Sequence, residues 1–342
     1  MNGMYPELDS LSLSELEARF RAALPEDPDL EAAVPPDPGL EYDDLWYDEV
    51  AIAIRKRDPQ DGVRFLRGEV AAADPDRLAA ILLAITWFGE RDRGNADLLI
   101  EGLKHPDEAV VARAIDGIAG LGGCGLTERI LALSADPREL VRGAVLRFAR
   151  HVVPDRAPTL LLDALQDPHY IVRWNAVDEL EELGYTPALA RIEALLADPH
   201  PRVREAALSA IASLEAPSQA VPLLLGALGD PHQFVRENAV RELDELDYTP
   251  ALPRIEALCA DPHPDVRQTA LAAVDRLGGP DTGIPLLRDA LGDPDATVRL
   301  LAVNHLGRLE QLTDRATFER MLNDPDEDVR ERVRSVLANH RS

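Results

Sequence analysis

Cysteine is nearly absent from this chain, which has only Cys124 and Cys259 among its 342 residues. Two cysteines so far apart form neither a disulfide framework nor a metal-binding pattern. No run of about 18 apolar residues is present, so we expect no membrane-spanning helix. The first residues also lack the charged-then-apolar pattern of a secretion signal. These absences predict a cytoplasmic protein without a metal or another cofactor.

Aromatic residues are scarce as well, at 4% of the chain, although hydrophobic residues make up 46%. The core must therefore consist of leucine, alanine, valine and isoleucine. Such a core is typical of closely packed helices.

Basic residues are too few to balance the acidic ones: 36 lysines and arginines stand against 62 aspartates and glutamates, a net charge of -26. Binding to phosphate backbones or anionic lipid surfaces needs clustered lysine and arginine. Nucleic-acid and membrane partners are therefore unlikely on charge grounds alone. The charge favours a basic partner, although acidic surfaces also serve solubility.

What the chain does have is a repeat. Nine Asp-Pro or His-Pro steps follow one another at intervals of 31 or 32 residues. Their first residues are Asp74, His105, Asp136, Asp167, Asp198, Asp230, Asp261, Asp293 and Asp324. A fixed period of this size predicts a solenoid, in which each unit buries its apolar face on its neighbours.

Each unit reads as helix A, a turn at the Asp-Pro step, and helix B. In the unit at Asp167 the residues Val172, Ala176, Leu180 and Leu183 form one apolar stripe. Gly184 is placed to end helix B. Aspartate is a strong N-cap and proline suits the first helical position, so we expect helix B to start at the Asp-Pro step itself.

The first 57 residues precede the repeats and differ from them. Ser12 and Glu15 form a capping box ahead of a short helix. Residues 25–39 are acidic and rich in proline, which predicts a linker, and residues 42–57 are expected to form a helix that covers the open end of the solenoid. We therefore divide the chain into an acidic N-terminal arm, 1–57, and a repeat domain, 58–342.

The pattern D-P-x-x-x-V-R-x-x-A-x-x-x-L resembles the HEAT-repeat superfamily, in the short form of the phycobilisome-lyase HEAT-like repeats, over roughly residues 60–340. The resemblance implies an all-α, right-handed α-solenoid of about nine two-helix repeats. It also implies a ladder of ion pairs between the turn aspartates from Asp136 onward and the following arginines. Those arginines are Arg142, Arg173, Arg204, Arg236, Arg267, Arg299 and Arg330. Alanine and valine pairs replace Val-Arg in the first two units, so the ladder should stop before residue 136.

Residues 167–214 and 230–277 align without gaps and are identical at 33 of 48 positions. A ligand with matching repeated features would explain this similarity. We favour recent duplication, with little time to diverge, as the simpler explanation.

Chemical motifs are largely missing. Four histidines follow Asp-Pro steps, but equivalent turns should lie about 10 Å apart, the width of a helix, which is too far for a shared zinc ion. The His-Glu pairs of the HEAT-like deoxyhypusine hydroxylases do not occur. The HEAT-like alkylpurine DNA glycosylases need a basic face, which the acidic balance disfavours. We therefore expect no enzyme, with a phycobilin lyase or isomerase, or a subunit of one, as the alternative.

In the family that this chain resembles, helix B lines the concave face. The residues opposite the apolar stripe there, and at equivalent positions, are Tyr170, Trp174, Asp178, Glu205, Glu237 and Arg241. An exposed tryptophan is typical of binding hot spots, although packing of Trp174 against a neighbouring helix is an equally open interpretation. We predict a non-catalytic scaffold or regulator that binds a protein or peptide, and the acidic charge favours a basic one. An acidic nucleic-acid mimic that blocks a basic protein is a further alternative.

Overall fold

The computed structural model describes residues 8, 10–22, 42–86, 93–308 and 315–339. Within these ranges the regular structure is entirely helical. The chain divides into two compact units, Met1–Leu183 (unit 1) and Gly184–Ser342 (unit 2). None of the described helices combines the length and the apolar character that crossing a bilayer requires.

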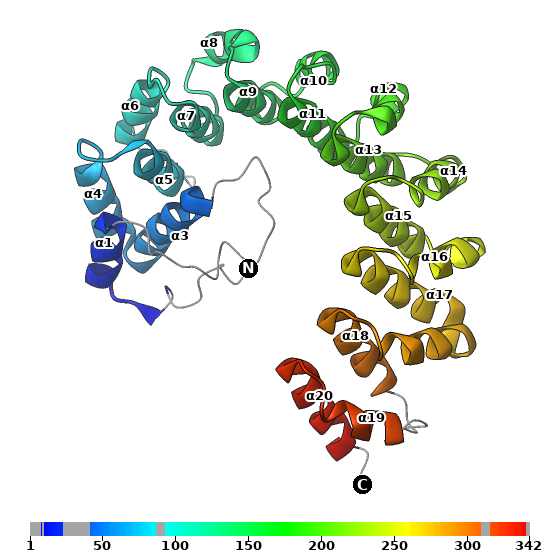
Figure 1. Ribbon diagram of the computed structural model, residues 1–342. Coiled ribbons are helices and arrows are strands. Elements are labelled where there is room, and N and C mark those ends of the chain that lie inside the picture. The colour runs from blue at the N-terminus through cyan, green and yellow to red at the C-terminus, as the bar shows by residue number, and fades with distance from the viewer. Residues whose placement is uncertain (1–7, 9, 23–41, 87–92, 309–314, 340–342) are drawn as a thin grey trace. The chain divides into compact units, whose positions relative to one another are not determined.

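The helices of unit 1 run along the chain as follows (Figure 1). They are α1 (Leu13–Arg21), α3 (Tyr42–Arg57), α4 (Pro59–Glu69), α5 (Pro75–Thr86), α6 (Arg93–Gly102), α7 (Glu108–Gly120), α8 (Thr127–Leu131), η2 (Ala132–Ala135), α9 (Glu139–Val152), α10 (Ala157–Ala164) and α11 (Tyr170–Glu182).

Unit 2 continues the same alternation. It contains η3 (Thr186–Ala188), α12 (Leu189–Ala194), η4 (Leu195–Ala197), α13 (Pro201–Leu214), α14 (Pro217–Ala227), α15 (Gln233–Glu245), η5 (Thr249–Ala251), α16 (Leu252–Leu258), α17 (Pro264–Ala290), α18 (Ala296–Leu306), α19 (Arg315–Met321) and α20 (Glu327–Asn339). A non-helical residue, Gly279, divides α17 into a helix B and the helix A of the next repeat.

The helices of each unit form two rows (Figure 1). In unit 1 the helix-B row is α5, α7, α9 and α11, whose successive members pack on one another, while α4, α6, α8 and α10 form the helix-A row. In unit 2 the helix-B row is α13, α15, the first part of α17, α18 and α20. The all-α solenoid architecture expected from the period is therefore confirmed.

The apolar stripe of helix B lies in the core, as predicted. Val172, Ala176 and Leu180 are at most 1% exposed, and Leu183 is half-buried at the helix end. Gly184 follows in the left-handed region with a φ of 60°, so the helix ends there. Aliphatic side chains from both rows fill the interior, in agreement with the low aromatic content.

The start of helix B differs from the prediction. At Asp167 the helix begins three residues later, at Tyr170, with His169 as the N-cap residue. The Asp167 carboxylate instead accepts the backbone N–H of His169 at 2.8 Å and closes a turn ahead of the helix. Only at Asp74, among the nine steps, does proline open the helix as expected.

The Asp–Arg ladder is present in both units. In unit 1, Arg142 donates two hydrogen bonds of 2.7 and 2.8 Å to Asp167 of the next repeat. Unit 2 has four bidentate pairs of the same geometry. They are Arg204–Asp230, Arg236–Asp261, Arg267–Asp293 and Arg299–Asp324. Asp136, which the resemblance placed in the ladder, instead pairs with Arg138 of its own turn, because the preceding repeat has valine where later repeats have the ladder arginine.

Two helices of the N-terminal segment agree with the sequence. Ser12 and Glu15 form both hydrogen bonds of a capping box at α1. Helix α3 spans the predicted residues 42–57 and packs on α5, the first helix of the helix-B row. The predicted linker 25–39 lies outside the described residues, and the boundary between residues 57 and 58 stays a prediction.

Candidate functional site

Three of the six predicted partner-binding residues lie on α11 of unit 1. Tyr170, Trp174 and Asp178 are four residues apart, so they lie on one helix face. Trp174 is 42% exposed, whereas Tyr170 is half-buried with its ring 5.1 Å from that of His169. Asp178 is exposed. The structure therefore supports the exposed interpretation of Trp174 over the packed one.

The other three predicted residues belong to the helix-B row of unit 2. Glu205 on α13 is half-buried and pairs with Arg202 at 3.1 Å. The Arg202 guanidinium lies 4.4 Å from the centroid of the Phe234 ring on α15. Glu237 and Arg241 lie one turn apart on α15, the first half-buried and the second exposed.

Charges around Glu237 oppose one another. Partial burial raises the pKa of the Glu237 carboxyl, Arg241 lowers it, and Asp265 and Glu205 raise it further. The net effect is an upward shift, so this surface holds a carboxylate that is incompletely balanced by its neighbours. The Arg241 side chain is available to an acidic group as well as to Glu237.

Unit 1 also has a polar groove that the sequence analysis did not identify. A cavity of about 210 Å³ crosses the helices α3, α5, α7, α9 and α11. Its lining comprises the small residues Ala79, Ala109 and Ala112, and the polar residues Asp48, Asp76, Arg113, Asp116, Arg147 and Asn175, with Leu140. The alanine side chains are too small to fill the cavity, and most of the polar side chains around it are charged.

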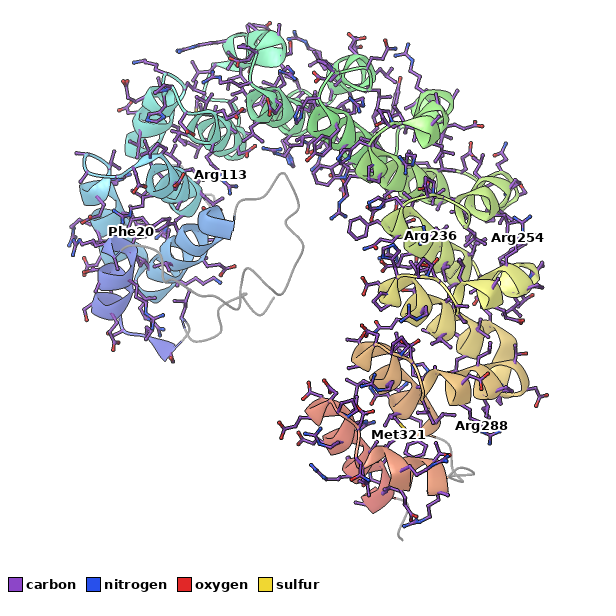
Figure 2. The ribbon with its side chains drawn as sticks, viewed as in Figure 1. Phe20, Arg113, Arg236, Arg254, Arg288 and Met321 are labelled. Atoms are coloured by element: carbon purple, nitrogen blue, oxygen red, sulfur yellow. The ribbon has the colours of Figure 1, made fainter. Side chains whose placement is uncertain are left out.

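Two ion pairs span this groove. Arg113, labelled on α7 in Figure 2, donates to Asp48 of α3 at 2.5 Å. Arg147 on α9 donates two hydrogen bonds, of 3.1 and 2.9 Å, to Asp116 on α7. Each pair joins two different helices, so interactions among the lining side chains hold the helices around the groove together.

The repeat period could have revealed the second of these pairs. Asp116, Arg147 and Asp178 occupy the same position in successive repeats, 31 residues apart. Opposite charges at equivalent positions of adjacent helices favour an ion pair. Asp48 gives no such signal, because α3 precedes the first repeat and its register relative to α7 depends on packing.

Acidic groups are in excess around Trp174. Arg150 donates to Glu179, which is 2% exposed, and lies 3.9 Å from Glu182. Withdrawal from water raises the pKa of the Asp178 carboxyl, and the charge of Glu182 adds to the rise, while Arg150 and Arg147 oppose it. The net effect is an upward shift, so the pKa of Asp178 lies above that of an ordinary aspartate, mainly because of partial burial.

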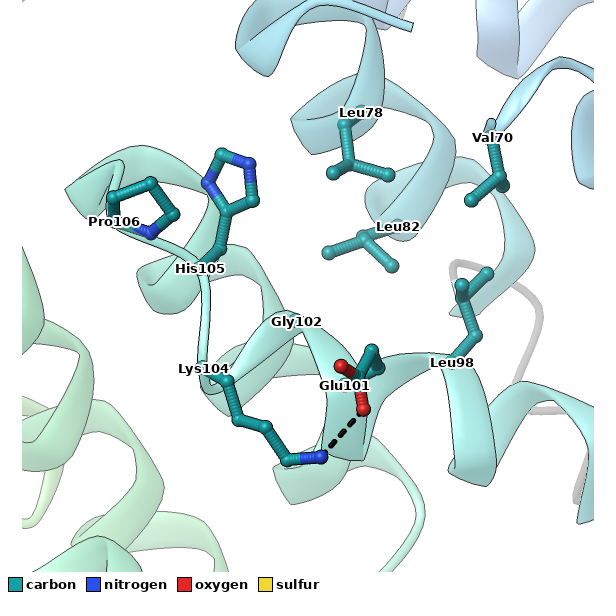
Figure 3. A pocket seen from close by; sticks show the side chains of 9 residues that line it. All are labelled: Val70, Leu78, Leu82, Leu98, Glu101, Gly102, Lys104, His105 and Pro106. Carbon is teal, nitrogen blue, oxygen red and sulfur yellow. Dashed lines mark hydrogen bonds and ion pairs between the residues drawn. The ribbon is translucent and has the colours of Figure 1, made fainter. Parts of the chain in front are cut away.

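Unit 1 also has an apolar pocket (Figure 3). It measures about 200 Å³ and opens between α5 and α6, with Leu78, Leu82 and Leu98 as its apolar walls. Lys104 and Glu101 form an ion pair of 2.6 Å at its edge. A third cavity, of about 270 Å³, lies in unit 2 beside the ion pair of His305 with Asp275.

Over the described part of the chain, histidine, cysteine, aspartate and glutamate form no group of three or more that could hold a metal ion. The thiol of Cys259 is half-buried, and burial raises its pKa to about 11. A thiol with that pKa is protonated at neutral pH and is a weak nucleophile.

Comparison with protein families identifies one model. The family of HEAT repeats matches residues 96–181, 126–212, 158–244, 190–275 and 252–338. These overlapping matches together span residues 96–338, well over half of the chain. No curated protein matches the chain.

Solved structures show the fold alone. The Escherichia coli protein YibA is 20% identical with a TM-score of 0.54, and the match covers 72% of this chain and 92% of YibA. An engineered protein is 17% identical with a TM-score of 0.42, over 96% and 99% of the two chains. The complex of CpcE and CpcF of phycocyanin lyase from Nostoc sp. PCC7120 is 19% identical with a TM-score of 0.39, over 78% and 98%. The last two similarities carry no argument about this chain.

Proposed function

Because the chain belongs to the HEAT-repeat family, as its repeated pattern predicted, we propose that it is a non-catalytic scaffold or regulator that binds a protein or peptide. The observation that carries this proposal is the exposure of Trp174 on the helix-B row. Among the described residues it is the large hydrophobic side chain that stands exposed, at 42%. Tryptophan is the residue type most enriched at binding hot spots.

The size and character of the cavities support a macromolecular partner over a small apolar ligand. The cavities described above measure about 200 to 270 Å³. Typical pockets for small ligands are larger, about 300 to 1,000 Å³, and mostly apolar. A surface with one aromatic side chain among charged groups is instead typical of a protein interface, where polar residues surround a small apolar centre.

Charge favours a basic partner over nucleic acid. The net charge of -26 repels phosphate backbones and attracts positively charged proteins. Association with a basic partner should therefore become slower as salt is added, because screening weakens the attraction.

The test begins with a partner isolated by affinity purification and identified by mass spectrometry. That partner is then titrated against the wild-type chain, Trp174→Ala and the control Glu193→Ala, whose exposed residue lies on α12 of the helix-A row. Removing the tryptophan should weaken binding by roughly 2 kcal/mol or more, about thirtyfold. The control should bind like the wild type.

Thermal melts of the same variants separate binding from folding. Since Trp174 is 42% exposed and lies outside the buried core, its replacement should leave the melting temperature nearly unchanged. Unaltered affinity of Trp174→Ala would remove this residue from the interface. A large loss of stability would show that it packs against the fold instead.

A further inference from the structure

The two similar segments, residues 167–214 and 230–277, differ mainly at accessible positions. Helices α11 and α15 occupy equivalent positions in the two copies. The six buried residues of α11 are all identical in α15: Val172, Asn175, Ala176, Val177, Glu179 and Leu180. Of the seven accessible residues of α11, five differ: Tyr170, Ile171, Trp174, Asp178 and Glu181.

The next pair of helices on the helix-B row shows the same pattern. Helix α13 corresponds to the first part of α17. Nine residues of α13 are accessible, and six of them differ in the copy: Arg202, Glu205, Ala206, Ser209, Ala212 and Ser213. The one difference among the five buried residues is conservative, isoleucine to valine at Ile211.

The helix-A row does not follow this pattern. Residues 186–197 have ten accessible positions, of which only Ala190 and Leu196 differ in the copy. Exposed polar residues such as Arg191 and Glu193 recur as Arg254 and Glu256. Figure 2 labels Arg254 on this row and Arg236 on the helix-B row of the same unit.

Relaxed drift after a duplication should reach accessible positions of both rows at similar rates, because neither set packs in the core. The differences are instead concentrated on the helix-B row. Contacts within the chain account for some of these changes, since Arg276, which replaces Ser213, pairs with Asp244 and Asp247. The changes at Trp174 and Asp178 are the ones that bear on a contact outside the chain. This pattern argues against a partner with matching repeated features.

The chemistry of the changes indicates what α11 contacts. Trp174 becomes Glu237 in the copy, and Asp178 becomes Arg241, so the charge of the second position is inverted. On α11 the nearby arginines are already engaged, Arg147 with Asp116 and Arg150 with Glu179. Asp178 makes no hydrogen bond or ion pair with a residue that the structure describes, so its carboxylate is open to an incoming cation.

We propose that the surface formed by Tyr170, Trp174 and Asp178 binds a basic segment of the protein partner. A lysine or arginine side chain of that segment stacks on the Trp174 ring and forms an ion pair with Asp178. The two residues are four apart on a helix, about 5–6 Å between their Cβ atoms. One guanidinium can therefore contact both, since cation–π contacts extend to about 6 Å from a ring centroid.

The proposal rests on the proposed protein-binding function and adds the chemistry of the partner. Trp174 and Asp178 are its specificity-determining residues. Helix α15, which carries Glu237 and Arg241 at the same positions, does not bind the same segment.

Fluorescent short peptides provide the probe: one set with clustered arginines, one with clustered lysines and one with clustered glutamates. Their binding to the full chain is measured by fluorescence anisotropy at about 0.15 M salt, where long-range attraction is largely screened. The variants Trp174→Glu and Asp178→Arg each introduce the residue that α15 carries at the equivalent position. The control Glu193→Arg makes the same charge change as Asp178→Arg on the helix-A row.

Specific binding and general attraction to an acidic protein predict opposite results for one variant. Trp174→Glu adds negative charge, so general attraction would strengthen binding of the basic peptides. The proposal predicts that it weakens their binding at least fivefold, because the stacking surface is lost. Asp178→Arg should weaken it about tenfold or more, and Glu193→Arg should change it less than twofold. Circular dichroism melts verify that each variant is folded.

Several outcomes would overturn the inference. One is equal loss of binding in Asp178→Arg and Glu193→Arg, and another is unchanged or tighter binding in Trp174→Glu. Preference of the wild-type surface for the glutamate peptides would show that the assigned charge is wrong. If an isolated partner depends on Trp174 while basic peptides do not, the docking function stands and the basic segment does not. If neither the isolated partner nor the basic peptides depend on Trp174 for binding, the proposed function is wrong as well.

Discussion

The turn aspartate has two tasks in every ladder repeat. One is local, because Asp261 accepts the backbone N–H of His263 at 2.9 Å and shapes the turn. The other is long-range, because the same carboxylate receives two hydrogen bonds from Arg236 of the preceding repeat. Arg236 also donates to the backbone carbonyl of Asp230, in its own turn. A planar guanidinium suits this arrangement, since its donors lie in a rigid fork.

Removal of a ladder arginine should strongly destabilise the fold. Arg236 is 8% exposed, so Arg236→Ala leaves the Asp261 carboxylate buried without its partner. We expect a loss of about 3–5 kcal/mol in the free energy of unfolding, measured by urea denaturation. Arg241→Ala on the same helix should change it by less than about 0.5 kcal/mol, because that side chain is exposed. Similar small effects of both changes would mean that the ladder contributes little.

The ladder should also make stability depend on acid. Burial disfavours the charge of Asp261, but the bonds from Arg236 and from the N–H of His263 outweigh burial and hold its pKa below the usual value. A lowered pKa stabilises the fold above the unfolded pKa, about 3.9, and this stabilisation is lost as the pH falls through the lower, folded value. Asp261→Asn should therefore be less stable than the wild type at pH 7. Urea denaturation should show the difference shrinking below about pH 4, and a constant difference would contradict the assignment.

At the scale of whole helices, glycine decides where two elements meet. The residues of α17 would read as one long helix, yet Gly279 has a φ of 67° and turns the chain between two repeats. Proline at 280 then opens the next helix, as its preference for the first turn allows.

Two alanine substitutions should have opposite effects on stability. A Cβ at Gly279 meets open space, but the left-handed backbone is strained for alanine, so Gly279→Ala should destabilise unit 2 by about 1 kcal/mol. A Cβ at Gly226 also meets open space, and this residue lies within α14, where alanine is the better helix former. Gly226→Ala should stabilise by up to about 1 kcal/mol. Thermal denaturation distinguishes the two, and a shift in the same direction for both would contradict this explanation.

The start of helix B shows why element boundaries are harder to predict than elements. Local rules place the N-cap at the aspartate of each Asp-Pro step. That choice fits Asp74, which has no ladder partner, but not Asp167, whose oxygens are used by Arg142 and by the turn. An arginine from the preceding repeat thus competes with the start of the helix for the aspartate carboxylate. Rules that consider only neighbouring residues in the sequence do not include this arginine.

At the scale of the molecule, stability should vary along the chain. Repeats contact mainly their neighbours, so end repeats are expected to open first. Ladder pairs begin with Arg142 and Asp167, and the earlier repeats lack them. Amides of α4 to α7 should therefore exchange with deuterium faster than those of residues 167–292, as measured by mass spectrometry. Uniform protection would instead indicate that α3, joined to α7 through Asp48 and Arg113, holds the first repeats firmly.

The sequence by itself determined the features that repeat. The period, the helix pairs and the buried stripe at Val172, Ala176 and Leu180 follow from residues that recur at fixed spacing. The Asp–Arg pairing was implied by the resemblance of those residues to HEAT repeats. These features can be predicted because each repeat packs on the next through the same residue types at the same positions.

Only the tertiary structure decided which accessible side chains gather into a surface. It showed Trp174 exposed, Glu179 buried beneath Arg150, and a groove between Asp48 and Arg147. These features depend on how far one helix is rotated against the next and on what small residues leave open. Neither quantity is encoded in a single repeat, so the contact surface emerges only when the helices are packed.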